Sequence, residues 1–274
     1  MLIKILCKIL YFSGLNFVYQ KFASRRLILL GYHSISNARN NKQLQGELYA
    51  HLSIPTQVFE KQIRFLIDKG YEFLRFSDLL DIKRKFRPLP KKSVIVYFDD
   101  GYKDNYLNAY PILKKLNITA VLFPTVGFIE KTSFPAWANR LDNIFLTWEE
   151  MKRMADVFEF GSHTITHRKL TALAPGDVEK EVILSRKILE ERLGQKVYAL
   201  SFPHSRTNKE VQEIAKKGGY EFALANGRGP NYENGYFLLK KIPLGPKDTM
   251  VDFKVKIGIL YPLIDLFRKI KLFL

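Results

Sequence analysis

Two adjacent carboxylates at the end of an apolar run are the strongest chemical signal in this sequence. Residues 94–98 read Val-Ile-Val-Tyr-Phe, and Asp99, Asp100 and Gly101 follow them directly. If this run is a strand of a parallel α/β fold, its carboxyl end belongs to the reactive face. Two acids held together there repel each other and lose hydration, so a bound cation would offset their cost. An Asp-Asp-Gly sequence is also common in helix caps and turns, and the motif alone leaves both interpretations open.

A second motif places two histidines four residues apart after another apolar run. It reads Gly161-Ser162-His163-Thr164-Ile165-Thr166-His167. Neutral imidazole is the commonest ligand for zinc-like metals, and this spacing lets two rings converge in a turn or helix. Two histidines and one aspartate leave coordination positions open, as in a catalytic metal site. The pair alone says little, but together with the two carboxylates it indicates such a site.

Two more histidines follow apolar runs that could be strands. His33 ends the sequence Gly31-Tyr32-His33, and His204 lies in Ser201-Phe202-Pro203-His204-Ser205. A lone histidine is more often structural than catalytic, although the end of a strand favours a role at the reactive face. His204 could be a further metal ligand or a surface turn residue.

Short β-rich runs alternate with helical patterns through the middle of the chain. We expect strands at 27–32, 93–98, 119–123, 158–161, 198–202, 220–225 and 237–242. We expect helices at 56–69, 77–85, 105–116, 147–156, 176–193 and 208–217. This alternation predicts an α/β fold with a mainly parallel sheet covered by helices. Seven or eight such units favour a barrel over an open sheet, and no linker divides the chain.

The charge of the chain is concentrated at its ends. The formal net charge is +17, and residues 1–46 carry seven basic side chains and no acid. Residues 240–274 carry eight basic and three acidic side chains. A nucleic-acid enzyme more often places its positive charge beside its active site, so no nucleic-acid partner is expected. The single cysteine, Cys7, excludes an intrachain disulfide and a thiolate metal cluster.

Both terminal segments are apolar and basic. Leu2, Ile5 and Leu6 recur at helical spacing, with Lys4 and Lys8 on another face. The C-terminal run is built similarly, with three basic residues among Leu and Phe. Such helices lie in the interface of anionic lipid, which predicts peripheral membrane association. The alternative is that both segments simply pack on the domain.

The location predicted from these segments is the cytoplasmic face of a membrane. Lys4 and Lys8 interrupt the apolar run and no small-residue cleavage site follows, which indicates that the segment is not a cleaved signal peptide. No uncharged apolar run reaches the roughly 20 residues that span a bilayer. The cell surface or the periplasm is the alternative location.

In combination, these motifs resemble the polysaccharide deacetylase family, the NodB-homology or carbohydrate esterase family 4 group. Residues 97–102 match the family's first motif and residues 163–167 its second. The early Tyr32-His33 is similar to the poly-N-acetylglucosamine deacetylase subgroup, in which the motifs are circularly rearranged. The resemblance implies a distorted (β/α)7-type barrel in a single domain over 27–244. The amphipathic terminal extensions would then be residues 1–26 and 245–274.

The resemblance also implies a role for each polar residue. Asp100, His163 and His167 would bind one divalent metal ion, with zinc expected first and cobalt, nickel or iron also suited to this donor set. Asp99 would be the general base that activates water. His33 would be the general acid for the leaving amine.

The third motif of the family is altered in this chain. The turn Pro203-His204 stands at its place, and a backbone N–H there would help to hold the oxyanion. The usual motif ends in an aromatic residue and a glycine, whereas His204 and Ser205 stand here. Some members carry an arginine just before the motif that tunes the base, and Ser201 or Phe202 occupies that place. Tyr102, Pro203 and Trp137 are the candidates for contact with a sugar ring.

The implied activity is metal-dependent N-deacetylation of an amino sugar in a cell-envelope polymer or its lipid-linked precursor. The acyl group is expected to be acetyl, with formyl as an alternative. A catalytically silent carbohydrate-binding protein on the same fold is a second hypothesis, since the altered third motif permits it. O-deacetylation of a secreted polymer is a third.

Overall fold

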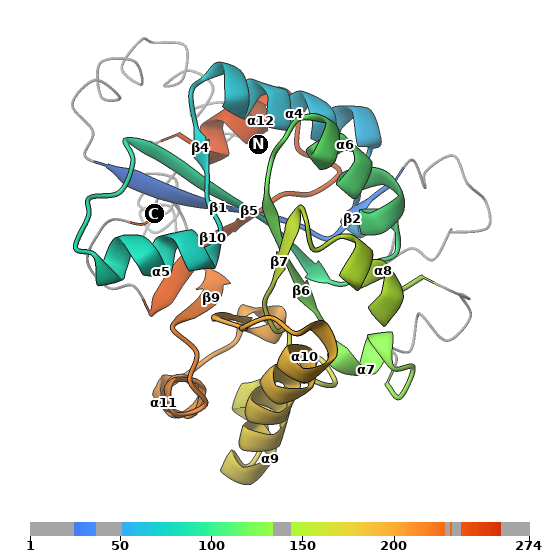
Figure 1. Cartoon of the computed structure of the whole chain (residues 1–274), viewed down its shortest axis with the longest axis vertical. Coiled ribbons are helices and arrows are strands. Elements are labelled where there is room, and N and C mark those ends of the chain that lie inside the picture. The colour runs from blue at the N-terminus through green and yellow to red at the C-terminus, as the bar shows by residue number, and fades with distance from the viewer. Residues whose placement is uncertain (1–24, 37–50, 134–143, 228–230, 232–236, 259–274) are drawn as a thin grey trace, which may run out of the picture.

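A curled sheet of eight parallel strands lies at the centre of the computed structural model, which describes residues 25–36, 51–133, 144–227, 231 and 237–258 (Figure 1). One short strand, β4 (Glu72–Phe73), pairs only with β5, and the other seven form a continuous path. They are β1 (Arg26–Tyr32), β5 (Lys92–Asp100), β6 (Ala120–Pro124), β7 (Phe158–Phe160), β8 (Ala199–Ser201), β9 (Phe222–Asn226) and β10 (Leu238–Pro243). Their order across the sheet is β7-β6-β5-β1-β10-β9-β8. All seven predicted strands and their parallel arrangement are therefore confirmed.

The two end strands of this sheet meet at one point. A parallel bridge joins Ser162, just after β7, to Leu200 in β8. The N–H of Ser162 donates to the Ala199 carbonyl (3.0 Å), and the N–H of Ser201 donates to the Ser162 carbonyl (2.9 Å). This short seam closes the sheet into the distorted barrel that the family resemblance implied. It also lies directly beside His163.

Helices surround the barrel (Figure 1). The larger ones are α4 (Thr56–Asp68), α5 (Phe76–Arg84), α6 (Tyr110–Lys115), α8 (Trp148–Arg153), α9 (Pro175–Glu179), α10 (Ser185–Leu193), α11 (Lys209–Lys217) and α12 (Met250–Lys256). Two π-helical turns, η3 (Asn105–Ala109) and η5 (Lys180–Leu184), precede α6 and α10. Smaller elements are β2 (Ser34–Ile35), β3 (Ser53–Ile54), β4 (Glu72–Phe73), α7 (Val126–Ile129) and the 3₁₀ turns η4 (Leu170–Ala172) and η6 (Pro203–Ser205). All six predicted helices are present, and α7 and α12 were not predicted.

The first strand in sequence lies in the middle of the sheet. β1 pairs with β5 on one side, with Gly31 opposite Tyr97, and with β10 on the other. The carboxyl ends of β5, β1 and β10, the second, first and last of these seven strands in the chain, therefore lie side by side. This placement brings together residues that are far apart in the chain.

Two glycines allow the barrel interior to close beneath the site. A Cβ on Gly31 would lie 2.0 Å from the Tyr97 hydroxyl oxygen, and one on Gly161 would lie 2.2 Å from a ring carbon of Phe123. Both aromatic rings are buried in the core inside the barrel. Only a residue without a side chain fits at either position, and each glycine lies two residues before a site histidine.

The chain continues on the barrel beyond residue 244. In α12, Phe253 is fully buried and its ring meets Phe65 of α4 edge-on, with 5.9 Å between centroids. Lys256 donates to the Pro243 carbonyl (2.8 Å) and forms an ion pair with Asp248 (2.7 Å). Residues 1–24 and 259–274, on which most of the predicted amphipathic pattern falls, lie outside the described residues. No helix among the described residues is long and apolar enough to cross a membrane.

Candidate metal centre

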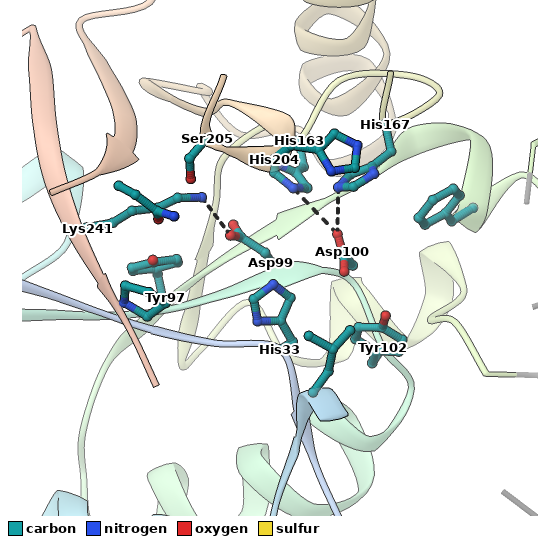
Figure 2. A pocket seen from close by; sticks show the side chains of 14 residues that line it. His33, Tyr97, Asp99, Asp100, Tyr102, His163, His167, His204, Ser205 and Lys241 are labelled. Atoms are coloured by element: carbon teal, nitrogen blue, oxygen red, sulfur yellow. Dashed lines mark hydrogen bonds and ion pairs between the residues drawn. The ribbon is translucent and has the colours of Figure 1, made fainter. Parts of the chain in front are cut away.

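Three predicted metal ligands converge at the carboxyl ends of β5 and β7 (Figure 2). Asp100 Oδ1 lies 3.5 Å from His163 Nε2 and 3.4 Å from His167 Nε2. The ligand atoms of the three residues all lie within 4.8 Å of one another. In a tetrahedral site with metal–ligand bonds of about 2.0–2.2 Å, neighbouring ligand atoms are about 3.3–3.6 Å apart. The two measured separations fit that geometry.

The protonation of His163 also fits a metal ligand. Its Nδ1–H donates to the Ser201 carbonyl (2.6 Å), which leaves a lone pair on Nε2. Burial lowers the pKa of His163 to about 4, so the ring is neutral at physiological pH. Asp100 Oδ1 is buried and accepts no hydrogen bond from the described residues. Two lone-pair atoms thus face each other, an arrangement that a divalent cation between them would stabilise.

The backbone around this cluster is held in an uncommon conformation. Eight non-glycine residues of the described chain have positive φ. Five of these surround the site: Asp100, Thr164, His167, His204 and Ser205. Such conformations cost about 1–2 kcal/mol each and persist where the surrounding structure imposes them. The sequence must therefore supply interactions that hold these loops in place.

Glu181 holds the loop that carries the two histidines. Its Oε2 accepts the N–H groups of Ile165 and Thr166, both at 2.9 Å, and its Oε1 accepts the Thr166 hydroxyl. The carboxylate lies in the π-helical turn η5 and is only 6% exposed. The sequence analysis did not single out Glu181, because nothing in the sequence separates it from the other acids of that helical segment. It positions the ligands without belonging to the cluster.

Lys241 is the second residue that sequence reasoning missed. Its ammonium group donates to Asp99 Oδ2 and to Ser201 Oγ, both at 3.0 Å. Both charged residues are buried, Lys241 at 5% exposure and Asp99 at 2%. Some family members carry an arginine just before the third motif. In this chain the cation beside Asp99 comes from β10.

The surroundings of Asp99 keep it ionised. Burial alone would raise the pKa of this carboxyl group, but the ammonium of Lys241, which also donates a hydrogen bond to it, holds it well below its ordinary value. Its Oδ1 is buried and accepts no hydrogen bond from the described residues. That oxygen is free to accept a proton.

His33 lies across the two carboxylates from the other histidines (Figure 2). Its carbonyl accepts a hydrogen bond from the side chain of Asn105 (2.8 Å). In the same region, Asp104 accepts the Ser34 hydroxyl (2.5 Å) and the Ile35 N–H (3.2 Å). The turn at the start of η3 thus fixes the end of β1, and with it the place of His33.

The altered third motif forms the 3₁₀ turn η6. The ring of His204 lies 4.6 Å from that of His167, between centroids, but its nitrogens are not part of the three-residue ligand cluster. Burial and the neighbouring His167 lower the pKa of His204. Ser205 has φ 55° at the position where the family places glycine, a conformation that glycine adopts without penalty. Pro203 is buried at the start of the turn.

The candidate ligands, Asp99, His33 and Lys241 share one cavity of about 560 Å³. The lining comprises His33, Leu52, Tyr97, Asp99, Asp100, Tyr102, Phe128, His163, His167, His204, Ser205, Asn226, Lys241 and Pro243. Tyr102 is buried in the wall, with its ring stacked on Phe145 at 5.3 Å between centroids. Trp137, the other aromatic candidate for sugar contact, lies outside the described residues. The volume is within the range of small-molecule sites.

The chain is similar to deacetylases in both sequence and structure. The family model described as Polysaccharide deacetylase matches residues 86–223. The Bacillus subtilis strain 168 protein YxkH carries the name of a polysaccharide deacetylase. It is 30% identical to this chain over 223 residues, which cover 81% of this chain and 72% of YxkH. The poly-beta-1,6-N-acetyl-D-glucosamine N-deacetylase of Staphylococcus aureus is 27% identical over 240 residues, which cover 80% of this chain and 79% of that protein. The Streptococcus pyogenes deacetylase PplD, solved in complex with acetate, has a TM-score of 0.72 and 26% identity, covering 86% of this chain and 99% of its own.

Proposed function

Because the chain belongs to the polysaccharide deacetylase family, we propose that it is a metal-dependent hydrolase that removes the acetyl group from an N-acetylated amino sugar. The observation that carries the proposal is the ionised, unpaired oxygen of Asp99 beside the three converging ligand atoms. A silent carbohydrate-binding protein would not need this complete set. The relative that acts on poly-N-acetylglucosamine supports an acetylated sugar polymer as the substrate.

Asp100, His163 and His167 would hold the metal ion in this mechanism. A divalent ion held by them would supply Lewis-acid polarisation of the substrate carbonyl group and would lower the pKa of water toward about 7. Asp99 takes the proton of the attacking water on its free Oδ1. Lys241 keeps Asp99 ionised and fixes its orientation through the other oxygen.

Two further groups complete amide hydrolysis. The attack places negative charge on the former carbonyl oxygen, and the backbone N–H of His204 would donate to it. An oxyanion donor is typically worth about 3–4 kcal/mol. His33, on the other side of the carboxylates, gives a proton to the departing nitrogen, because an amine anion is too poor a leaving group. The products are acetate and a free amino sugar.

The same proposal includes a location at a membrane. The basic and apolar composition of the terminal segments supports peripheral contact with anionic lipid, with the cytoplasmic face as the proposed side. The substrate is then a nascent cell-envelope polysaccharide or a lipid-linked sugar. Zinc is the proposed metal, since two histidines and one carboxylate suit it.

The test is acetate and formate release by the metal-loaded protein, with Asp99→Asn as the control. The substrates are soluble N-acetylglucosamine oligomers and polyprenyl-phosphate-linked amino sugars. We expect acetate release by the wild type and a loss of roughly 10²–10⁴-fold in the variant. Equal rates would refute the role of Asp99. Oligomer binding without any release, by protein shown to contain metal, would favour the carbohydrate-binding protein.

A further inference from the structure

Phe86, in the connection between α5 and β5, is held out into solvent. It is 95% exposed, more than any other large hydrophobic side chain of the described residues. Its φ of 49° lies in the left-handed region that usually ends a helix with glycine. The N–H groups of Phe86 and Arg87 donate to carbonyls in the last turn of α5, so this conformation belongs to the helix end. A large apolar residue therefore stands where glycine would be more stable.

Basic residues flank this phenylalanine in the sequence. Residues 83–92 contain six basic side chains and no acid: Lys83, Arg84, Lys85, Arg87, Lys91 and Lys92. Glu221 pairs with Lys83 and Arg84, both at 3.3 Å.

The remaining acids leave part of this positive charge unpaired. Asp81 pairs with Lys85 at 2.7 Å, and Glu72 and Asp78 lie in the same shallow hollow as Arg87. Exposed ion pairs of this kind contribute little to the stability of the fold. Arg87 and Lys91 form no ion pair with a described carboxylate.

The first described residues, Arg25 and Arg26, lie beside this loop. Arg26, at the start of β1, lies opposite Lys92 in the sheet register. The guanidinium of Arg25 donates to the Leu89 carbonyl (2.6 Å). The 24 residues before Arg25 carry three lysines and no acid. Arg25, Arg26 and the loop therefore make one basic edge at the amino ends of β1 and β5.

From this juxtaposition we propose that the Phe86 loop, residues 85–91, docks on an anionic lipid surface. An exposed apolar side chain flanked in the chain by basic residues matches the boundary between headgroups and acyl chains, where the ring is buried and the charges meet anionic headgroups. A soluble polyanion would engage the cations without using the exposed ring. Lipid is therefore the partner that this surface fits.

This docking orients the catalytic cavity away from the lipid, an inference that rests on the proposed function. β5 starts at Lys92, beside the loop, and ends at Asp99 and Asp100 in the cavity. A nine-residue strand spans about 30 Å. A sugar attached directly to a lipid headgroup would not reach the cavity in this orientation. The substrate is then a polymer long enough to extend about that far from the surface.

Labelling of the full chain at two sites tests the orientation. In a Cys7→Ser background, an environment-sensitive fluorophore is attached to Phe86→Cys or to Leu107→Cys. Leu107 is 58% exposed on η3, near the cavity end of the barrel. With phosphatidylcholine vesicles that contain phosphatidylglycerol, we expect blue-shifted emission from the label at 86 and none from the label at 107. A blue shift from the label at 107, or no blue shift from the label at 86, would overturn the proposal. A blue shift at 86 with heparin but not with vesicles would also overturn it.

Vesicle sedimentation measures the strength of the contact. Phe86→Ser should lower the partition coefficient on the order of tenfold, and Arg87→Gln about fivefold. Leu184→Ser and Lys187→Gln, exposed on η5 and α10, are matched controls that should leave it unchanged. Acetate release from soluble oligomers should be the same in Phe86→Ser and wild type. Lost sedimentation with retained hydrolysis supports the proposal, and equal sedimentation of Phe86→Ser and Leu184→Ser contradicts it whether or not the protein is a deacetylase.

Discussion

The ammonium of Lys241 lies 3.0 Å from Asp99 Oδ2, although the two residues are 142 positions apart in the chain. Both are buried, and the ammonium also donates to Ser201 Oγ. A buried carboxylate without a partner would become protonated rather than remain charged. The proposed base is thus ionised because the last strand of the sheet provides its counter-ion.

Replacement of Lys241 should therefore move the acid limb of the pH–rate profile. Asp99 acts as a base only when it is ionised, and burial is opposed mainly by this cation. In Lys241→Met the pKa of Asp99 rises, so kcat/KM should begin to fall at a higher pH than in the wild type. Lys241→Arg should restore most of the profile. Lys240→Met, at the exposed neighbouring position, is the control, and an unmoved limb in Lys241→Met would contradict the assignment.

The same ion pair predicts how stability depends on pH. The pKa of Asp99 is lower in the folded state than its ordinary value of about 3.9. The contribution of Asp99 to the free energy of unfolding is therefore complete above about pH 3.9. It is lost as the pH falls through the lower pKa of the folded state. At neutral pH, Lys241→Met should lower the free energy of unfolding by about 3–5 kcal/mol, because the carboxylate is left buried without its partner. Urea denaturation measures the difference, and Lys240→Met should lie near zero.

Metal binding should stabilise the fold through Asp100. A ligand that binds only the native state at one hundred times its Kd adds about 2.7 kcal/mol to the free energy of unfolding. We expect zinc to raise the melting temperature of the wild type and of Asp99→Asn, and chelation to reverse the rise. Asp100→Asn should show no rise, because the charged oxygen ligand is lost and only the two histidine nitrogens remain. A zinc-dependent rise in Asp100→Asn would place the ion elsewhere.

Glu181 should affect metal affinity without touching the ion. Loss of one such positioning interaction typically costs 10–100-fold in affinity. Glu181→Gln should weaken zinc binding by about this factor, as measured by competition with a chromophoric chelator. Glu159 is the matched control, since its buried carboxylate also accepts two backbone N–H groups, from Phe76 and Ser77. Equal zinc affinity in Glu181→Gln and Glu159→Gln would reduce Glu181 to a purely structural role.

His33 should matter only for substrates with a poor leaving group. An amine needs a proton as it departs, whereas 4-nitrophenolate does not. His33→Gln should lose about 10²–10⁴-fold in kcat on N-acetylglucosamine oligomers and little on 4-nitrophenyl acetate. Comparable losses on both substrates would show that His33 positions the site rather than protonating the leaving group.

Local pattern was sufficient to predict the seven long strands and to indicate a metal site built from two histidines and a carboxylate. The family resemblance then assigned Asp100 as the carboxylate ligand. Alternating runs of strand and helix type predicted every long strand of the barrel, because burial on both faces selects continuous apolar residues. The ligands were predictable for a related reason. Asp99 and Asp100 end one strand and His163 follows another, so the parallel arrangement alone brings them to one face.

The tertiary structure alone decided which other groups complete the site. Lys240 and Lys241 are adjacent and identical in type, and only the inward side chain of Lys241 reaches Asp99. Glu181 is one of several acids in its helical segment, and the π-helical turn η5 holds it against the histidine loop. The physical reason is the range of the interactions. Strand and turn preferences act within a few residues, whereas the pairing of β1 between β5 and β10 joins segments that no local pattern connects.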